Sequence, residues 1–381
     1  MKIVIAPDSW KECMSAMDVA RNIADGMRQV FPGAQYALLP MADGGEGTVK
    51  ALVEATRGRL VSVSVTGPEG KPVAAFYGLS DDGHCAFIEM AAASGLALVN
   101  KKDRDPMVAT SRGTGELILA ALNAGARKFI LGIGGSATND AGAGMLQALG
   151  VRLLDKRGEA LPSGGAALLQ LERIDTSGLD SRLASCIIEV ACDVDNPLTG
   201  EKGASAVFGP QKGATREMVA QLDAALVHFA QVVQRDMAID VLSLPGGGAA
   251  GGMGAALSAF CGATLRQGVH MVMDALGLET QLRDADIIIT GEGRTDGQTA
   301  CGKVPAGVAE LAKRYAKPVI ILSGSLEQDA DRVYQRGVDA MFSVLARIVT
   351  LEEALDDAAI NIRNAAKNIA QILAIGQSLG Q

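Results

Sequence analysis

The sequence predicts an α/β protein with two lobes: a doubly wound lobe formed by both chain termini, and a second α/β lobe with a mixed sheet inserted between them. Three observations lead to this fold class. The chain has 381 residues, more than one ordinary core contains. Gly is abundant, at 46 residues, and aromatic residues make up only 3%, which suits helices packed closely on a parallel sheet. Strands and helices alternate regularly near both termini, whereas the middle has a different rhythm.

The N-terminal elements begin with KIVIAPDS, a short apolar run that predicts a strand ending in a polar turn. SAMDVARNIADGMRQVF predicts a helix, because its apolar residues recur every three or four positions and Ser15 can cap the first turn. QYALLP predicts the second strand and TVKALVEAT the second helix. The loop PMADGGEGT, residues 40–48, therefore joins a strand to a helix N-terminus, a position where open α/β sheets bind ligands.

The middle of the chain starts with three closely spaced runs, RLVSVSVTG, KPVAAFYGL and HCAFIEM, whose hairpin spacing predicts antiparallel strands. From about Thr114 the elements alternate again. GELILAALNAG predicts a helix, RKFILGI and CIIEVACDVDNP predict strands, and residues 215–238 predict a long helix. A glycine-rich loop then leads into a helix of small residues.

The C-terminal part returns to the strand–helix rhythm from about Asp286. DIIIT, KPVIILSGS and DAMFSVL predict strands, GKVPAGVAELAKRY predicts a helix, and a last helix is expected from Thr350 to about Leu373. We place the boundaries near 58 and near 272. The predicted domains are therefore residues 1–57 plus 273–381, and residues 58–272.

Composition and charge exclude several classes of protein. The formal net charge is −8 and no basic run is present, which argues against nucleic acid as a partner. No apolar run approaches the ~18 residues that span a bilayer, so no membrane is expected. The six cysteines form no C-x-x-C pair and no secretory signal is visible, which together predict a cytoplasmic protein. A homo-oligomer is left open.

Three standard motifs can be compared with the sequence. Gly297-x-x-x-x-Gly302-Lys303 resembles a Walker A loop, but Val follows where that motif needs Ser or Thr for Mg²⁺. The loop GIGGSA fits the relaxed dinucleotide fingerprint, with Asp155 at a tolerable distance, and this keeps an NAD(P)-dependent dehydrogenase as an alternative. No G-x-S-x-G elbow exists and the three histidines are isolated, so a Ser-His-Asp hydrolase has little support.

Carboxylates recur beside glycines in several loops. Each one can be a turn former or a helix cap, but the set fits a nucleotide–Mg²⁺ site. Glycine N–H groups and helix N-termini bind phosphate oxygens, and carboxylates bind the metal that bridges to the same phosphates. A divalent cation would thus make acidic groups attractive to a phosphate. The members are Asp43, Glu46, Asp140, Asp193, Asp195, Glu292 and Asp296.

A series of long segments, in order along essentially the whole chain, resembles the bacterial glycerate kinase family of the type that makes 2-phosphoglycerate. These segments are MKIVIAPDSWKECMSA, ADGGEGT, AAASGLALV, TSRGTGELI, GIGGSATNDAGAGM, CDVDNPLTG, FGPQKGA, GAAGGMGAAL, ITGEGRTDGQT and GKVPAGVA. The resemblance implies ATP-dependent phosphorylation of D-glycerate with Mg²⁺, by direct transfer in a cleft between two lobes. It also implies that the lobe built from both termini is flavodoxin-like. Cys13 and Gly297 depart from the family pattern, which usually has Ser at both positions.

Within this mechanism the sequence offers an inventory of candidates for each role. Lys11 and Arg294 would hold the glycerate carboxylate or the transferring phosphoryl group. Asp193 is the first choice to accept the hydroxyl proton, with Asp296 second. Mg²⁺ is assigned to Asp43 and Asp140. The nucleotide phosphates are assigned to Gly134, Gly135, Ser136, Gly247 and Gly251, and further substrate contacts to Ser15, Gly44 and Gly45.

Three alternatives remain open at this stage. A dehydrogenase on the GIGGSA loop would bind NAD(P), and a non-catalytic sugar-acid sensor would bind its ligand without turnover. Phosphorylation at the 3-hydroxyl is the third, because only the family resemblance favours the 2-position.

Overall fold

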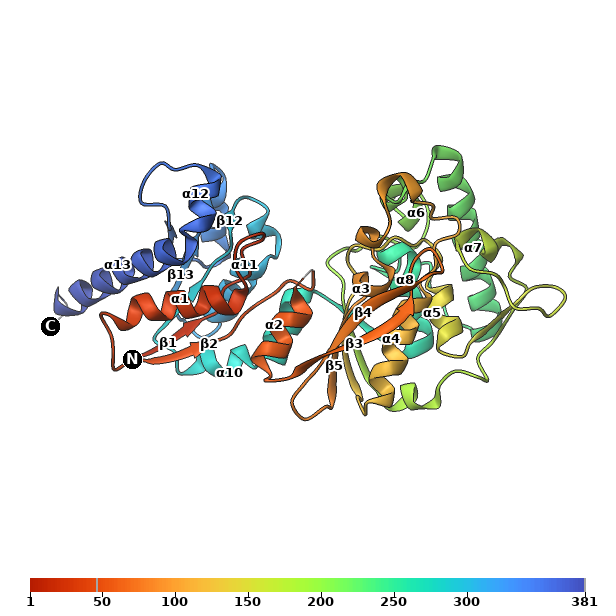
Figure 1. The fold of residues 1–381 in the computed structure, drawn as a ribbon, viewed down its shortest axis with the longest axis horizontal. Coiled ribbons are helices and arrows are strands. Elements are labelled where there is room, and N and C mark those ends of the chain that lie inside the picture. Colours follow the sequence, from red (N-terminus) through yellow and green to blue (C-terminus); the bar gives the residue numbers. More distant parts are fainter. Residues whose placement is uncertain (46, 380–381) are drawn as a thin grey trace. The chain divides into compact units, whose positions relative to one another are not determined.

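The computed structural model describes residues 1–45 and 47–379, so Glu46 of the predicted carboxylate set lies outside the described residues. Contacts within the chain divide it into two compact units (Figure 1). Unit 1 comprises Met1–Asp43, Lys50–Thr56 and Val269–Gln381, and unit 2 comprises Gly44–Val49 and Arg57–Gly268. These units are defined by contacts within the chain. They do not test the domain boundaries near 58 and 272, which stay a prediction.

Unit 1 is built on a parallel sheet of five strands in the order β15-β13-β11-β1-β2. Numbered along the chain within this unit, the order read from the other edge is 2-1-3-4-5, which is the flavodoxin-like arrangement. The expected flavodoxin-like lobe is therefore confirmed. The strands are β1 (Lys2–Ile5), β2 (Gln35–Leu38), β11 (Ile287–Thr290), β13 (Val319–Ser323) and β15 (Ala340–Ser343); β12 (Arg294–Thr295) pairs with β14 (Ser325–Leu326) outside this sheet.

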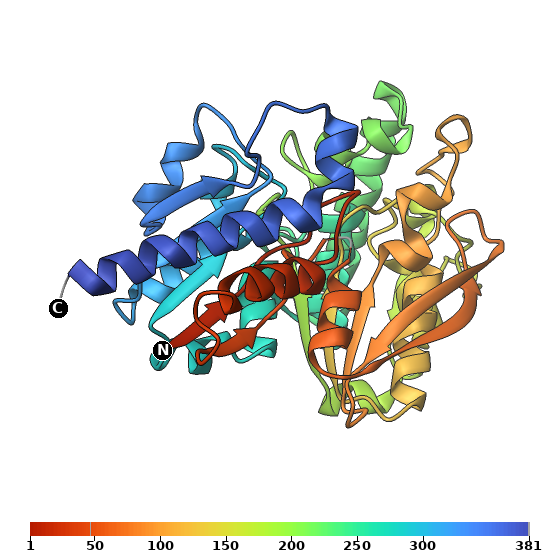
Figure 2. The same cartoon turned by 60° about the vertical axis from the view of Figure 1, so that its left-hand side comes forward.

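Two helices, α1 (Ala16–Arg28) and α13 (Ala358–Leu379), lie side by side on one face of this sheet (Figures 1 and 2). Ser15 begins α1 as predicted, because its hydroxyl accepts a hydrogen bond from the N–H of Asp18. Gly26 permits the close approach of the two helices: a Cβ there would lie 2.3 Å from the carbonyl oxygen of Arg363. The other helices assigned mainly to unit 1 are α2 (Thr48–Ala55), α9 (Gly268–Ala275), α10 (Leu278–Arg283), α11 (Val304–Lys313) and α12 (Leu351–Asp356).

The last predicted helix, from Thr350 to about Leu373, is in fact two helices. The first, α12, has a capping box between Thr350 and Glu353 at its N-terminus and ends at Asp356; Asp357 is its C-cap, and α13 follows directly. Periodicity alone did not show this break, because apolar residues continue across it. The break places Leu351 and Leu355 at a cavity while α13 continues along α1.

Unit 2 contains a mixed sheet of six strands in the order β10-β9-β6-β5-β4-β3. The pairs β3–β4 and β4–β5 are antiparallel, as the hairpin spacing predicted, and the remaining pairs are parallel. The strands are β3 (Arg59–Thr66), β4 (Pro72–Leu79), β5 (Cys85–Glu89), β6 (Lys128–Gly132), β9 (Ile187–Ala191) and β10 (Thr264–Arg266); β7 (Arg152–Leu154) and β8 (Arg173–Asp175) form a separate antiparallel pair. The fold class predicted from the sequence is thus confirmed.

The helices of unit 2 bury many small apolar residues in one core. The long predicted helix is confirmed as α7, and the glycine-rich loop does lead into α8. Residues 250–252 at the start of α8 have left-handed backbone angles, so the regular part of α8 begins after them. The helices are α3 (Ala91–Ser94), α4 (Arg112–Asn123), α5 (Ala143–Ala148), α6 (Ala204–Phe208), α7 (Arg216–Met237) and α8 (Ala249–Cys261).

Two further findings concern the whole described chain. None of its helices combines the length and the apolar character needed to cross a membrane. All six cysteines are described and none forms a disulfide.

Candidate active site

A cavity of about 480 Å³ opens in unit 1 at the carboxyl ends of β1, β11, β13 and β15. β1 and β11 are the neighbours between which the strand order reverses, and open α/β sheets bind ligands at such a switch point. The fold therefore directs the loops after these strands into one place. The lining residues with charged or polar side chains are Asp8, Ser9, Lys11, Asp43, Glu292, Arg294, Lys303 and Ser325.

Three carboxylates line this cavity. Asp8 follows β1, Asp43 follows β2 and Glu292 follows β11. Burial raises the pKa of Asp8 to about 7, and the nearby carboxylates of Asp43 and Glu292 act in the same direction. Burial also raises the pKa of Glu292, although hydrogen bonds from Thr299 Oγ1 (2.5 Å) and Thr295 Oγ1 (3.3 Å) to its Oε1 oppose that rise. The field of this wall is therefore suited to a cation.

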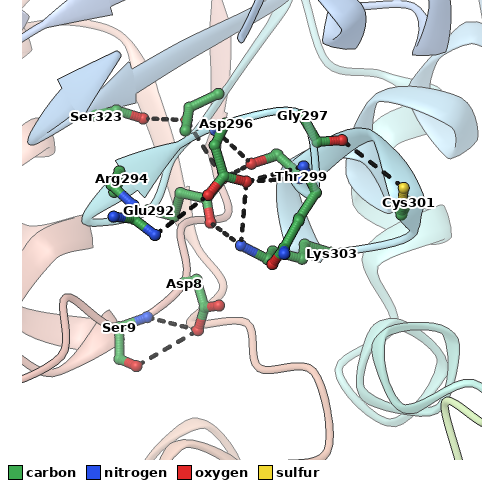
Figure 3. Close-up of polar contacts among 12 residues, drawn as sticks. Asp8, Ser9, Glu292, Arg294, Asp296, Gly297, Thr299, Cys301, Lys303 and Ser323 are labelled. Carbon is green, nitrogen blue, oxygen red and sulfur yellow. Dashed lines mark hydrogen bonds and ion pairs between the residues drawn. The ribbon is translucent and has the colours of Figure 1, made fainter. Parts of the chain in front are cut away.

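Three cationic side chains line the same cavity: Lys11, Arg294 and Lys303. Figure 3 shows Asp296 between the last two, with Arg294 Nη2 at 3.4 Å from its Oδ2 and Lys303 Nζ at 3.6 Å from its Oδ1. Lys303 Nζ also lies 3.7 Å from Glu292 Oε2. The pKa of Asp296 is lowered: burial alone would raise it, but Lys303 and two backbone N–H groups outweigh burial. Asp296 is thus a charged partner that can orient two cations.

The remaining wall of the cavity is mostly apolar. It comes from Trp10, Val344, Leu345, Leu351, Ala354, Leu355 and Ala358. Cys13 belongs to this wall, and its Sγ lies 3.8 Å from the carbonyl oxygen of Leu355. Burial raises the pKa of the Cys13 thiol, so the neutral thiol is favoured there. The cavity thus has one strongly polar side and one apolar side.

Unit 2 carries the loop between β6 and α5, which contains the predicted phosphate-binding residues Gly134, Gly135 and Ser136. Gly134 and Gly135 are exposed and Ser136 is buried. In the described part of the chain, no hydrogen bond is donated by the backbone N–H groups of these three residues. A Cβ at Gly134 would meet no atom within 4 Å, and Gly135 has a φ of +72° that favours glycine. We call residues 134–136 the Gly134–Ser136 tip. Its backbone N–H groups donate to no described acceptor, and those of Gly134 and Gly135 belong to exposed residues.

Beneath the tip lie a carboxylate and an ammonium group that are both buried, Asp140 and Lys212. Asp140 accepts hydrogen bonds from Ser111 Oγ (2.8 Å) and from the N–H groups of Ser111, Gly142 and Gly144. These bonds lower its pKa, but burial has the larger effect and the pKa is raised. Its acceptor sites are largely filled, which favours a structural role; the metal role predicted from the sequence is not tested by these contacts.

The other predicted site residues of unit 2 occupy varied places. Asp193 is exposed just after β9, and its Oδ1 accepts a hydrogen bond from the N–H of Gly268 at the start of α9. Gly247 and Gly251 are buried. A Cβ at Gly251 would lie 2.1 Å from the carbonyl oxygen of Thr138, so close backbone packing explains this glycine. The phosphate role of Gly247 and Gly251 stays a prediction.

The predicted substrate contacts also divide between the units. Ser15 in unit 1 uses its hydroxyl in the cap of α1 and is absent from the described lining of the cavity. Gly44 and Gly45 belong to unit 2, where a Cβ at Gly44 would lie 2.6 Å from the Cβ of Ala191. Close packing accounts for Gly44, and the substrate role of Ser15, Gly44 and Gly45 stays a prediction.

The dinucleotide fingerprint lacks its required context. A Rossmann loop leads directly into a helix, but here α5 begins only at Ala143, well after Ala137. Asp155 follows β7, which pairs with β8 and is not a strand of the six-stranded sheet. It therefore does not end a strand next to β6, where a ribose-binding carboxylate would lie.

Sequence reasoning missed three residues of interest. Asp8 lies in the turn after the first strand, where any polar residue is expected. Lys303 stands in the near-match to a Walker A loop, and Val304 after it, in place of Ser or Thr, removes that motif as a signal for Lys303. Lys212 lies in the segment FGPQKGA, and nothing in the sequence marks it as buried.

Mg²⁺ is compatible with the carboxylates of the unit 1 cavity. Among residues 1–45 and 47–379, no group of three or more His, Cys, Asp or Glu side chains could hold a metal alone. Mg²⁺ commonly uses only one or two carboxylates and completes its shell with water and phosphate oxygens. The acidic wall of the cavity fits that pattern, with the other ligands supplied by a substrate.

Comparison with known proteins agrees with this geometry. The family model described as "Glycerate kinase family" matches residues 3–374. The chain belongs to the glycerate kinase family. It is 57% identical over 376 residues to a protein of Escherichia coli named glycerate 2-kinase, covering 99% of both chains, and 54% identical to the glycerate kinase of Bacillus subtilis, covering 100% of this chain and 99% of the relative. A crystal structure from Salmonella typhimurium, provisionally named glycerate kinase 2, superposes with a TM-score of 0.93 at 61% identity over 99% of both chains.

Membership of the glycerate kinase family decides the class of activity. The chain is an enzyme, a kinase that acts on a small molecule, and the match includes residues of both units. The alternative of a dehydrogenase on the GIGGSA loop agrees neither with the family nor with the structure after β6.

Proposed function

We propose that this enzyme transfers the terminal phosphoryl group of ATP to the 2-hydroxyl of D-glycerate, with Mg²⁺, to give 2-phosphoglycerate. The observation that carries the proposal is the cavity at the switch point of unit 1, where three cations face three carboxylates. Its support is the membership of the glycerate kinase family and the name of the relative from Escherichia coli.

The substrate carboxylate would bind to the cations of the cavity. Arg294 can form paired hydrogen bonds with a carboxylate, and Lys11 can approach as a single charge. Asp296 holds Arg294 and Lys303 at the cavity through its ion pairs. Preformed ion pairs reduce the number of side-chain conformations that are lost on binding.

Mg²⁺, when bound, would supply positive charge that neutralises the phosphate groups. We propose Asp43 as the residue that holds it, with Asp8 beside it on the same wall. Asp140 remains a second metal candidate from the sequence. The oxygens of Asp43 and Asp8 are the hard ligands that Mg²⁺ prefers.

The proton of the reacting hydroxyl would pass to Asp193, an exposed carboxylate at the carboxyl end of β9. Phosphoryl transfer needs little covalent assistance, so the main task of this carboxylate is to orient the hydroxyl. Asp296, the second candidate, is already held by two cations and is better suited to orient them.

The phosphates of ATP would bind at the tip Gly134–Ser136. The free backbone N–H groups there can donate to phosphate oxygens, and the absence of side chains allows close approach. Among the glycines predicted from the sequence, Gly134 and Gly135 have the open surroundings that a phosphate needs. We propose a cytoplasmic location as well, in line with six free cysteines.

A coupled assay of ADP release tests the proposal. ADP is expected to appear only when D-glycerate, ATP and Mg²⁺ are all present, and L-glycerate serves as the matched control. Phosphorus–proton coupling in the NMR spectrum of the product then identifies the phosphorylated carbon. ADP release independent of D-glycerate would contradict the proposed substrate, and a phosphate on carbon 3 would contradict the proposed position.

A further inference from the structure

Lys212 is an unusual residue in this molecule because its ammonium group is enclosed by the core of unit 2. It ends a short 3-10 turn, Pro210–Lys212, and its side chain is 2% exposed. Burying an unpaired charge is costly, so a buried lysine must be compensated by close polar partners. Burial lowers the pKa of Lys212 to about 7, while Asp140 acts in the opposite direction.

Both partners of Lys212 belong to the loop that follows β6. Its Nζ donates to Ser136 Oγ at 2.7 Å and to the carbonyl oxygen of Thr138 at 2.6 Å. Neither partner is a carboxylate, so the side chain is bound to the loop by hydrogen bonds alone, with Asp140 as the carboxylate whose charge favours the ammonium form. Among the described residues it donates to Ser136, directly after Gly135, and to Thr138, two residues further along the same loop.

These contacts fix the direction of the Ser136 hydroxyl. An ammonium group has donors only, so Ser136 Oγ must accept from it. The hydroxyl hydrogen of Ser136 then remains to be donated to another group, and an anionic oxygen is the best acceptor. Together with the free N–H groups of Gly134, Gly135 and Ser136, this makes a set of donors above a buried cation.

Backbone hydrogen bonds also fix the other residues of the loop after β6. Gly135 and Ala137 form backbone hydrogen bonds with Leu96 and Ser94, and the N–H of Ala141 donates to the carbonyl oxygen of Gly251. Ala141 itself has a φ of +50°, an unfavourable conformation that only such surroundings maintain. Strain of this kind is typical of binding sites.

We propose that Lys212 is a positioning residue for nucleotide binding: it orients Ser136 and supplies positive charge beneath the Gly134–Ser136 tip. This inference rests on the proposed function, because it assumes that the phosphates of ATP bind at that tip. It assigns to a residue inside the core the charge that a Walker A lysine supplies from the loop itself.

The experiment measures binding of Mg²⁺–ATP and of D-glycerate separately by calorimetry at pH 6.5, for wild type, K212M, S136A and the double variant. K128M is the matched control, because Lys128 lies at the start of β6 and pairs with Glu189 at 3.3 Å, away from the loop. We expect K212M to weaken ATP binding at least tenfold and S136A about threefold, with D-glycerate affinity and all K128M values within twofold of wild type.

The two effects should also be less than additive in the double variant, because both variants disrupt the same hydrogen bond. Unchanged ATP affinity in folded K212M would overturn the inference, as would equal losses for ATP and D-glycerate, which indicate a general structural defect. If K212M does not fold, S136A decides: a selective loss of ATP affinity supports the inference and no loss overturns it. If wild type phosphorylates D-glycerate while S136A and K212M bind ATP as tightly as wild type, this inference fails and the proposed function stands. If wild type does not phosphorylate D-glycerate, the proposed function itself fails.

Discussion

In unit 1, the ionisable side chains of the candidate site line a cavity, whereas in unit 2 the ionisable residues Asp140 and Lys212 are both buried. Asp8 shows the effect of the first arrangement, because burial, reinforced by the neighbouring carboxylates of Asp43 and Glu292, raises its pKa to about 7. Asp140 shows the second, because four hydrogen bonds surround it. A carboxylate at a cavity, such as Asp8, is available to a ligand. A buried carboxylate whose acceptor sites are filled, such as Asp140, stabilises the loops around it.

The comparison predicts its largest effect at Asp140. Asp140→Ala should lower the free energy of unfolding by about 3–5 kcal/mol, because it leaves the buried donors of Ser111, Gly142 and Gly144 without their acceptor. Chemical denaturation followed by circular dichroism measures this loss. Asp155→Ala is the control, since Asp155 accepts hydrogen bonds only within an exposed turn, and should cost about 1 kcal/mol or less. A stable Asp140→Ala protein that needs more Mg²⁺ for activity would instead favour the metal role predicted from the sequence.

At the cavity of unit 1, by contrast, loss of a charge should affect binding more than stability. Arg294→Met should raise the KM for D-glycerate about 30- to 100-fold, equivalent to about 2–3 kcal/mol, because charge-assisted hydrogen bonds to the substrate carboxylate are lost. The KM for ATP and the unfolding midpoint should change little. Arg283→Met, at the end of α10 in the same unit, is the matched control. A KM for D-glycerate equal to that of wild type would remove Arg294 from the substrate site.

Asp8 sharpens the comparison through pH. Its pKa is raised from 3.8 to about 7 on folding, so the unfolded chain releases this proton at lower pH than the folded protein. The contribution of Asp8 to stability therefore falls as pH rises from about 4 to 7, and its full cost is present above pH 7. Asp8→Asn should lack this fall and be more stable than wild type at pH 8 by about 2 kcal/mol, less than the roughly 4 kcal/mol of the full shift because solvent reaches the cavity.

Unfolding curves of Asp8→Asn and wild type at pH 4.5 and pH 8 make this comparison. A difference between the two proteins that is the same at both pH values would show that Asp8 is not under-paired. The expected gain in stability should accompany a loss of kcat, since residues at ligand sites are commonly unfavourable for stability.

The smallest expected effect is at Cys13, on the apolar wall of the cavity. Cys13→Ser should change the unfolding free energy by less than about 1 kcal/mol and kcat/KM by less than twofold, because its Sγ has only a weak contact at 3.8 Å with the carbonyl oxygen of Leu355. Steady-state kinetics and thermal unfolding measure both quantities. A tenfold gain in kcat/KM would mean that the hydroxyl usual in the family contacts the substrate directly.

Much of the fold could be predicted from the sequence because local patterns determine it. Apolar runs such as IIIT in β11 and the spacing of apolar residues in α1 identified the elements, and the rhythm at both termini indicated one shared sheet. The break at Asp357 was missed because its cause is a turn between two apolar patterns. The phosphate role of Gly251 stays a prediction, and its close contact with the backbone at Thr138 depends on a neighbour that the sequence does not reveal.

The candidate site was harder to predict for a different reason. Lys11 and Arg294 were identified from loop position, and both line the cavity. Asp8 and Lys303 acquire their importance from neighbours that are remote in sequence, such as Glu292, and Lys212 acquires it from burial. Composition and motif spacing do not show which residues are neighbours in space. The strand order of the structure does, because it identifies the switch point between β1 and β11.

A crystal structure of the protein soaked with D-glycerate tests the central claim most directly. Density for the acid is predicted in the unit 1 cavity, with its carboxylate within hydrogen-bond distance of Arg294 or Lys11. Well-defined density for D-glycerate at another site, with this cavity holding only solvent, would contradict the account.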